Sequence, residues 1–490
     1  MNPHVVAVVR GDGHYHENPP FHPSGSVPEC PFSGRSPGNP AYELVRSALH
    51  RLGWDAGNFG TAGWNPLAAL VRPGDTVLLK PNLVVDRHPR DPDGLRYTLT
   101  HGSMVRAIAD YVVLALKGSG RIVVADAPQT DSSFRTIAER VGLLALEAFY
   151  RECGVDFEVV DLRAEEWRNQ GGVIVERIRL PGDPLGYSIA DIGEHSAFCG
   201  YQGEGRYYGA DYDTTFVNRQ HQGVTHRYSM SNTALDCDVF INLPKLKTHK
   251  KGGLTCSLKN LVGINGDKNY LPHHTVGSPQ DGGDQYPQRR TSNRVEHSVA
   301  AALRRLSLSV PAVGTPLLRT ARSVGARLFG SGGIAIRSGN WHGNDTVWRM
   351  TLDMNRILLY WDKVRRTVSA QQPRKRYLSV VDAIVAGDGN GPMDPDPRAI
   401  GVVLVGTDPV AVDATAAVLM GFDPARIPTI RHGFAPHFLP LLEGSWESIE
   451  VVSNQAQWTG ALGSVGFDIQ PFEPHFGWRG HIERASAAVG

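Results

Sequence analysis

The chain has 490 residues, enough for roughly two to four domains of about 150 residues each. Lys and Arg total 50 against 49 Asp and Glu, and this balance argues against general binding to the phosphates of a nucleic acid, which needs a clear basic excess. Apolar residues make up 41% of the chain and charged residues 20%, which argues against wholesale disorder and predicts a sizeable core.

The five cysteines are scattered singly, and none forms a CxxC pair. A cysteine-held zinc ion or iron–sulfur cluster therefore lacks its usual spacing, and the odd number fits reduced thiols in a cytosolic protein. The stretch MNPHVVAVVRGDGHY has no basic region before a long apolar run, and no run of about 18 apolar residues occurs elsewhere. We expect a soluble, cytoplasmic protein with no membrane partner.

Strands and helices alternate through the first third of the chain. HVVAVVRG, at 4–11, is a β-branched run ended by Gly and predicts a buried strand. AYELVRSALHRLG, at 41–53, has helical apolar spacing and a Gly stop. Strand, helix and strand at this spacing form βαβ units and indicate a parallel sheet. The same patterns predict strands at 74–85, 121–128 and 157–163 and helices at 101–118 and 134–153.

The remainder of the chain is less regular. Residues 181–230 form short, turn-rich pieces, 237–245 is a strand, and 275–300 is a polar loop. The last third predicts a strand, a loop, a strand, a turn and a helix between residues 377 and 422. Helical patterns occur at 298–310, 317–330 and 346–366. We therefore predict an α/β fold, with a mostly parallel sheet flanked by helices and with irregular insertions.

Four sequence blocks are specific enough to suggest a family. They are VLLKPNLV, THGSMVRAI, INLPKLKTH followed by GLTCSLKNLVG, and DAIVAGDGNGP followed by GVVLVGTDPVAVDATAAVLMGFDP. In this order they resemble the family described as domain of unknown function 362, and the resemblance implies a fold and a site location but no particular reaction. Some members carry an added ferredoxin-like cysteine cluster. Its spacing is missing here, so no iron–sulfur cluster is expected.

The blocks place polar residues where apolar strands end. Ligands of open α/β sheets bind at the carboxyl ends of the strands, so we expect the active site there. The resemblance also suggests one family domain with insertions. Its expected segments are an N-terminal α/β segment at 1–180, an irregular insertion at 181–235, a core lysine and histidine motif at 236–275, a helical insertion at 276–375 and a C-terminal α/β segment at 376–490.

Lys247, His249 and Lys259 follow one of these strands and are the candidate catalytic residues. Ammonium groups held close together repel one another unless an anion or carboxylates compensate. The group predicts a pocket for a phosphate or carboxylate, with one lysine lowered enough in pKa to act as a base. The alternative is a solvated loop with its lysines spread outward, and Lys250 and Lys251 are assigned to solvent.

Candidate substrate-binding residues come from the same strand ends. Lys80 and Asn82 share a face of an extended segment, and a buried Lys at the end of an apolar strand would need a partner. An exposed Trp341 would suit stacking on a sugar or another ring, whereas a buried one would only cover the core. The full set is Lys80, Asn82, Lys245, Asn260, Asn390 and Trp341.

Asp388 and Asp413 are candidate metal ligands, because carboxylate oxygens suit Mg²⁺ or Mn²⁺. The alternatives are that Asp413 caps a helix and that Asp388 forms a salt link to the lysines. Histidines beside the core motif form a further candidate metal set, with chance as the alternative. They are His221, His226, His273 and His274.

The sequence thus predicts an enzyme that acts on a small phosphorylated or carboxylated metabolite, including a sugar derivative, through a pocket of Lys, His and Asn. The cofactor is unknown, and the sequence is compatible with a divalent metal. One alternative is a redox or metal-cofactor protein, and another is a non-catalytic accessory protein of a biosynthetic pathway. The reaction class and the oligomeric state stay open.

Overall fold

The computed structural model describes residues 1–23, 27–32, 38–170, 173–210, 214–289, 336 and 338–484. The predicted helices at 298–310 and 317–330 and the end of the predicted loop at 275–300 lie outside these residues. Within the described part of the chain, no helix is long and apolar enough to cross a membrane.

An eleven-stranded sheet forms the centre of the molecule. Neighbours from β17 to β4 are parallel, whereas β18 is antiparallel to both β17 and β1. The predicted α/β fold with a mostly parallel sheet is confirmed, with an antiparallel hairpin in its middle. The main path runs through β20 (Gly460–Ala461), β19 (Glu450–Ser453), β1 (Val5–Arg10), β18 (Asp394–Gly406), β17 (Arg376–Asn390), β11 (Val239–Leu243), β2 (Thr76–Pro81), β3 (Arg121–Asp126) and β4 (Phe157–Asp161).

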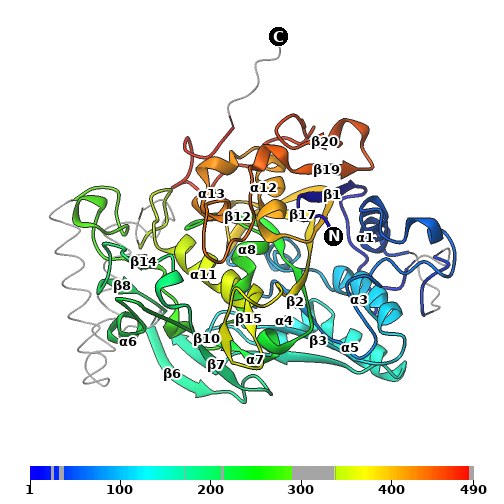
Figure 1. Ribbon diagram of the computed structural model, residues 1–490, viewed down its shortest axis with the longest axis horizontal. Helices are drawn as coiled ribbons and strands as arrows, with labels where there is room; N and C mark the ends of the chain where they lie inside the picture. Colours follow the sequence, from blue (N-terminus) through cyan, green and yellow to red (C-terminus); the bar gives the residue numbers. More distant parts are fainter. Residues whose placement is uncertain are drawn as a thin grey trace, which may run out of the picture.

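Side chains alternate along each strand between two hydrophobic layers. In β2, Val77 and Leu79 belong to one buried cluster and Leu78 to the other. Helices cover both faces, with α1 and α3 on one side of the sheet and α11, α12 and α13 on the other (Figure 1). Burial of both faces explains why the strands are almost continuously apolar. The helices are α1 (Pro40–Arg51), α3 (Gly102–Leu116), α4 (Phe134–Arg140), α5 (Leu143–Glu152), α11 (Val347–Leu359), α12 (Pro409–Leu419) and α13 (Pro428–Gly433).

Two predicted helices are shorter in the structure. The pattern at 134–153 is divided into α4 and α5, because Gly142 between them has a left-handed φ of 82°. The pattern at 346–366 is helical only as far as Leu359, and the residues beyond form a small hairpin of β15 (Trp361–Asp362) and β16 (Thr367–Val368).

The predicted irregular insertions are present as small elements outside the main sheet. β5 (Glu165–Gln170) and β6 (Val173–Arg179) form a hairpin. A second sheet has the order β7 (Tyr187–Asp191), β10 (Thr225–Ser231) and β9 (His221–Gln222), and β8 (Tyr207–Tyr208) pairs with β14 (His274–Thr275). The short helices are α2 (Leu95–Thr98), α6 (Thr214–Gln220), α7 (Asn232–Asp236) and α8 (Ser257–Asn260).

The stretch PKLKTHK, expected simply to follow a strand, is itself a strand. β11 continues past Pro244 as β12 (Lys245–His249), and β12 pairs in parallel with the later part of β17 and antiparallel with β13 (Gly253–Thr255). β2, the other neighbour of β11, ends at Pro81. The lysines of β12 therefore extend beyond the carboxyl end of β2, where open sheets bind their ligands.

The stretch AGDGNGP, predicted as a loop between strands, lies largely within β17. This strand runs to Asn390 and pairs with β18 as far as Asp394. Asp388 and Asn390 therefore lie near the tip of a long hairpin.

Candidate anion-binding site

Lys80 and Asp126 form a buried ion pair where β2 and β3 end. Lys80 Nζ lies 2.7 Å from Asp126 Oδ1, and it also donates to the Pro81 carbonyl at 2.8 Å and to Asn260 Oδ1 at 3.2 Å. Burial lowers the pKa of Lys80, and the carboxylate of Asp126 opposes that shift. The Lys80 ammonium is therefore held by groups of the protein itself.

Hydrogen bonds through two amide side chains connect this ion pair to β12. Asn82 Nδ2 donates to Asn260 Oδ1 at 2.8 Å, and Lys247 Nζ donates to Asn82 Oδ1 at 2.7 Å. Lys247 also donates to the carbonyl of Thr98, at the end of α2. The structure thus brings Lys80, Asn82, Lys247 and Asn260 together from β2, the segment after it, β12 and α8.

Lys247 is completely buried, and its environment disfavours a positive charge. Burial, followed by the charge of Lys245, holds the pKa of Lys247 well below its usual range, although Asp126 acts in the opposite direction. An uncharged amine has two hydrogens, enough for its two acceptors, and keeps one lone pair. An uncharged Lys247 amine has a lone pair that could accept a proton, and its role as a base stays a prediction.

Lys245 has different partners from Lys247, although only one residue separates them. Its Nζ donates to Tyr15 Oη at 2.6 Å and to Asp382 Oδ2 at 3.1 Å, and the Tyr15 hydroxyl donates to the same carboxylate. The pairing of β12 with β17 is irregular between the two lysines. The predicted substrate-binding residue Lys245 is thus tied to a buried carboxylate of the protein.

Lys259, in α8, is a cation without a counter-charge in the part of the chain that the structure describes. Its side chain is partly buried, and it forms no hydrogen bond or ion pair with any residue in the described ranges. Burial lowers the pKa of Lys259 to about 8. Its own charge contributes to lowering the pKa of several neighbouring groups, which places it among them. These neighbours and Lys259 are called here the cationic cluster, which consists of Lys247, His249, Lys251, Lys259, Lys268 and His273.

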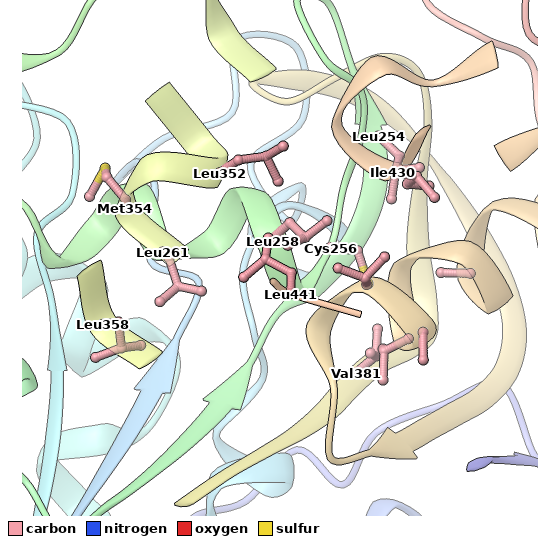
Figure 2. Close-up of a cluster of buried hydrophobic side chains, with 14 of the residues drawn as sticks. Leu254, Cys256, Leu258, Leu261, Leu352, Met354, Leu358, Val381, Ile430 and Leu441 are labelled. Carbon is pink, nitrogen blue, oxygen red and sulfur yellow. The ribbon is translucent and has the colours of Figure 1, made fainter. Parts of the chain in front are cut away.

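Apolar packing positions α8 and with it Lys259. Leu258 and Leu261 belong to the same buried cluster as Leu352 and Leu358 of α11. Figure 2 shows these leucines beside one another, with α8 between α11 and the strands of the sheet. One side of the short helix is thus committed to the core.

His249 is held in one tautomer by the loop that follows it. The backbone N–H groups of Lys251 and Gly252 donate to His249 Nδ1 at 3.0 and 3.1 Å. Nδ1 is therefore unprotonated, and the neutral ring carries its hydrogen on Nε2. Burial, followed by the charge of Lys259, holds the pKa of His249 well below its usual range, so the ring is uncharged at neutral pH.

The sequence placed Lys251 in solvent and His273 only in a candidate metal set, and it gave no role to Lys268 or Asp126, whereas Lys251 is partly buried in the structure. Lys251 Nζ donates to the carbonyl of His273 at 3.3 Å, and burial lowers the pKa of Lys251 to about 7. Lys268 donates to three backbone carbonyls, and burial lowers its pKa to about 7 as well. Three of the four lie in the same Lys-rich and His-rich stretch as the predicted site, and Asp126 lies near the end of the strand predicted at 121–128. These positions in the sequence were the only features that could have pointed to the four residues.

Asn390 and Trp341 are not among the partners of the cationic cluster. Asn390 is exposed near the tip of the β17–β18 hairpin. Trp341 is buried, and its Nε1 donates to the Asp284 carbonyl at 2.7 Å. Trp341 thus matches the alternative in which a buried Trp covers the core.

Asp388 and Asp413 have structural partners in the protein. Asp413 lies in α12 and accepts hydrogen bonds from the first two N–H groups of α8 at 2.6 and 3.1 Å, so it caps a helix other than its own. Asp388 accepts from the N–H of Glu473 at 2.7 Å, and its ion pair is with Arg398 rather than with the lysines. Among the described residues, no group of three or more His, Cys, Asp or Glu is placed to hold a metal ion.

Comparison with known proteins gives the chain a family. It is 24% identical over 387 residues to the thylakoid-associated protein sll1697 of Synechocystis sp., which covers 79% of this chain and 72% of that protein. A crystal structure of a protein from Thermotoga maritima matches with 10% identity and a TM-score of 0.29, over 76% of this chain and 56% of that one. The model of the family described as Domain of unknown function (DUF362) matches residues 77–187 and 198–418, which include the whole cationic cluster. The resemblance seen in the sequence is confirmed, and the chain belongs to the DUF362 family.

Proposed function

We propose that this protein binds a small phosphorylated or carboxylated metabolite at the cationic cluster and acts on it as an enzyme. The observation that carries the proposal is the ammonium group of Lys259, partly buried beside Lys251 and Lys268 and without an acidic partner among the described residues. Ammonium groups in such an arrangement repel one another, and an anion placed among them removes that repulsion.

Two carboxylates whose charges act on the cluster are already engaged in other contacts. Asp126 is paired with Lys80 and accepts from the N–H of Leu83 at 2.6 Å. Asp284, whose charge reaches Lys251, accepts from the hydroxyl of Thr346 at 2.6 Å and from the N–H of residue 345 at 2.8 Å. We infer that a ligand supplies the compensating negative charge.

The surrounding groups favour chemistry rather than storage of an ion. Lys247 and His249 have pKa values lowered by burial and by neighbouring charges, and groups perturbed in this way are typical of sites that transfer protons. Asn82 and Asn260 hold Lys247 and the end of α8 in fixed positions relative to each other. Preorganised hydrogen-bonding groups of this kind support catalysis.

The proposal is tested by identifying what the native protein carries. Wild-type protein, Lys259→Gln and Lys117→Gln would be purified in parallel, denatured, and their released small molecules identified by mass spectrometry. Lys117 is exposed at the end of α3 and loses the same charge, so it is the matched control. We expect an acidic metabolite from wild type and the control and much less from Lys259→Gln. No acidic metabolite in any sample, or equal amounts in all three, would contradict the proposal.

The two alternatives drawn from the sequence, a redox or metal-cofactor protein and a non-catalytic accessory protein of a biosynthetic pathway, gain no specific support from the contacts at the site. We also propose a cytoplasmic location. All five cysteines are free thiols, which suits a reducing compartment.

A further inference from the structure

The rings of His249 and His273 are hydrogen-bonded in opposite senses. His249 Nδ1 accepts from two backbone N–H groups, so its hydrogen is on Nε2. His273 Nδ1 lies 2.9 Å from the carbonyl oxygen of Leu271, and because a carbonyl can only accept, this nitrogen carries the hydrogen. The neutral rings are therefore opposite tautomers: His249 presents an N–H at Nε2, and His273 presents a lone pair at Nε2.

Both Nε2 atoms are available to a ligand. Neither has a hydrogen-bond partner among the described residues. Lys251 contacts both residues, since its N–H donates to the His249 ring at Nδ1 and its Nζ donates to the backbone carbonyl of His273 at 3.3 Å. Burial, and then the charges of Lys259 and Lys251, lower the pKa of both rings, so both are neutral near pH 7.

We propose that His273 is the proton acceptor of this site and that His249 is a neutral hydrogen-bond donor to the same bound anion. This inference rests on the proposed function. It moves the proton-transfer role that the sequence suggested for His249 to a histidine outside the predicted site. A neutral imidazole N–H can polarise an oxygen without carrying charge itself.

The proposed step is a balanced proton transfer. The lone pair of His273 Nε2 forms a bond to a hydrogen of an O–H or C–H group of the ligand, and the ring becomes an imidazolium. The electron pair of the broken bond stays on the ligand. The ligand oxygen that gains negative charge accepts a hydrogen bond from His249 Nε2–H and is attracted by the ammonium of Lys259.

Diethyl pyrocarbonate distinguishes the two tautomers, because it adds to an imidazole nitrogen that has a free lone pair. At pH 7 we expect His273 to react at least about tenfold faster than His249, whose Nδ1 lone pair is occupied and whose Nε2 carries a hydrogen. Peptide mapping by mass spectrometry gives the rate at each ring. The exposed His14 serves as the internal control for the reagent.

Inorganic phosphate is the probe for occupancy, with its binding measured separately by calorimetry. Bound phosphate should slow modification of His273 about tenfold, in line with a directly covered nitrogen, and leave His14 unchanged. Equal reactivity of His249 and His273 would overturn the tautomer assignment. Phosphate that binds without protecting His273 would overturn its role. Absence of calorimetric binding would count against the proposed function instead.

Two variants separate the donor role of His249 from its role in the loop. In His249→Asn, the amide oxygen can accept the loop N–H groups, but nothing replaces Nε2–H. In His249→Gln, the amide N–H reaches the Nε2 position, but the loop acceptor is lost. We expect phosphate affinity to fall about tenfold in the Asn variant, with little change in Tm, and the Gln variant to be less stable but to keep more affinity. If the Asn variant kept phosphate affinity and the Gln variant lost it, His249 Nε2–H would not be a donor to the bound anion.

Discussion

Lys80 Nζ and Asp126 Oδ1 lie 2.7 Å apart at the adjoining ends of β2 and β3, and both side chains are buried. A second buried pair joins Lys245 to Asp382 at 3.1 Å. These two lysines are therefore neutralised within the protein, whereas Lys259 has no such partner in the described part of the chain. Lys80 and Lys245 therefore have structural roles in the site, whereas the ammonium group of Lys259 is available to bind a ligand.

Replacing Asp126 tests the first of these pairs. Asp126→Asn leaves the ammonium of Lys80 buried without its carboxylate, and we expect the free energy of unfolding to fall by about 3–5 kcal/mol. Urea denaturation at pH 7 measures this. The double variant Lys80→Met, Asp126→Leu removes both charges and should recover part of the loss. A single variant that loses less than about 1 kcal/mol would show that no buried charge depends on this carboxylate.

Lys247→Ala should reduce stability as well as binding. The substitution removes a fully buried side chain and leaves Asn82 Oδ1 and the Thr98 carbonyl without their donor. We expect a loss of about 2–4 kcal/mol from the cavity and the unmade hydrogen bonds, seen as a lower Tm. Lys363→Ala is the control, because its ion pair with Asp238 is on the surface and contributes less than about 1 kcal/mol. An unchanged Tm for Lys247→Ala would contradict the buried network.

Lys259 should reduce stability at neutral pH. Burial lowers the pKa of Lys259 from 10.5 to about 8. Between these values the unfolded chain binds more protons than the folded one, so this group makes stability rise with pH from about 8 to 10.5 and imposes its full penalty below pH 8.

Lys259→Met should therefore be more stable than wild type at pH 7. We expect a gain of about 1 kcal/mol, because partial exposure lets solvent screen the charge, together with weaker phosphate binding. Unfolding free energies measured at pH 7 and pH 10 should show the gain shrinking as the pH rises. A variant that is less stable than wild type at pH 7 would contradict an unpaired, desolvated ammonium.

Asp413 should act as a helix cap and not as a metal ligand. Asp413→Ala leaves the first two N–H groups of α8 without an acceptor, and we expect a loss of about 1–2 kcal/mol in unfolding free energy. Dialysis of the wild-type protein against EDTA should leave its Tm unchanged. A Tm that falls on chelation and returns with Mg²⁺ would favour a metal site instead.

Part of the site could be predicted because it depends only on strand order. Lys80, Asn82 and Lys247 each follow or continue an apolar strand, and in a parallel sheet those strand ends lie at one edge. Asp126, the partner of Lys80, is 46 residues away in the chain, and it becomes a neighbour only because β3 lies beside β2. Spacing along the sequence gave no indication of that pairing.

Other features depended on departures from regular geometry. Two-residue spacing on an ideal strand would put Lys245 and Lys247 on one face with shared partners, but the irregular pairing of β12 with β17 gives each its own partners. The sequence suggested that Asp413 caps a helix. It did not indicate that the capped helix is α8, because that contact exists only when α12 and α8 pack together. The tautomers of His249 and His273 depend on single backbone hydrogen bonds, which no residue pattern reveals.

A crystal structure of the protein with inorganic phosphate tests the central claim most directly. We predict a phosphate ion with an oxygen about 3 Å from Lys259 Nζ and another within hydrogen-bonding distance of His249 Nε2. Phosphate bound elsewhere, with the Lys259 ammonium paired to a carboxylate of the protein, would contradict the claim that this lysine binds an anionic ligand.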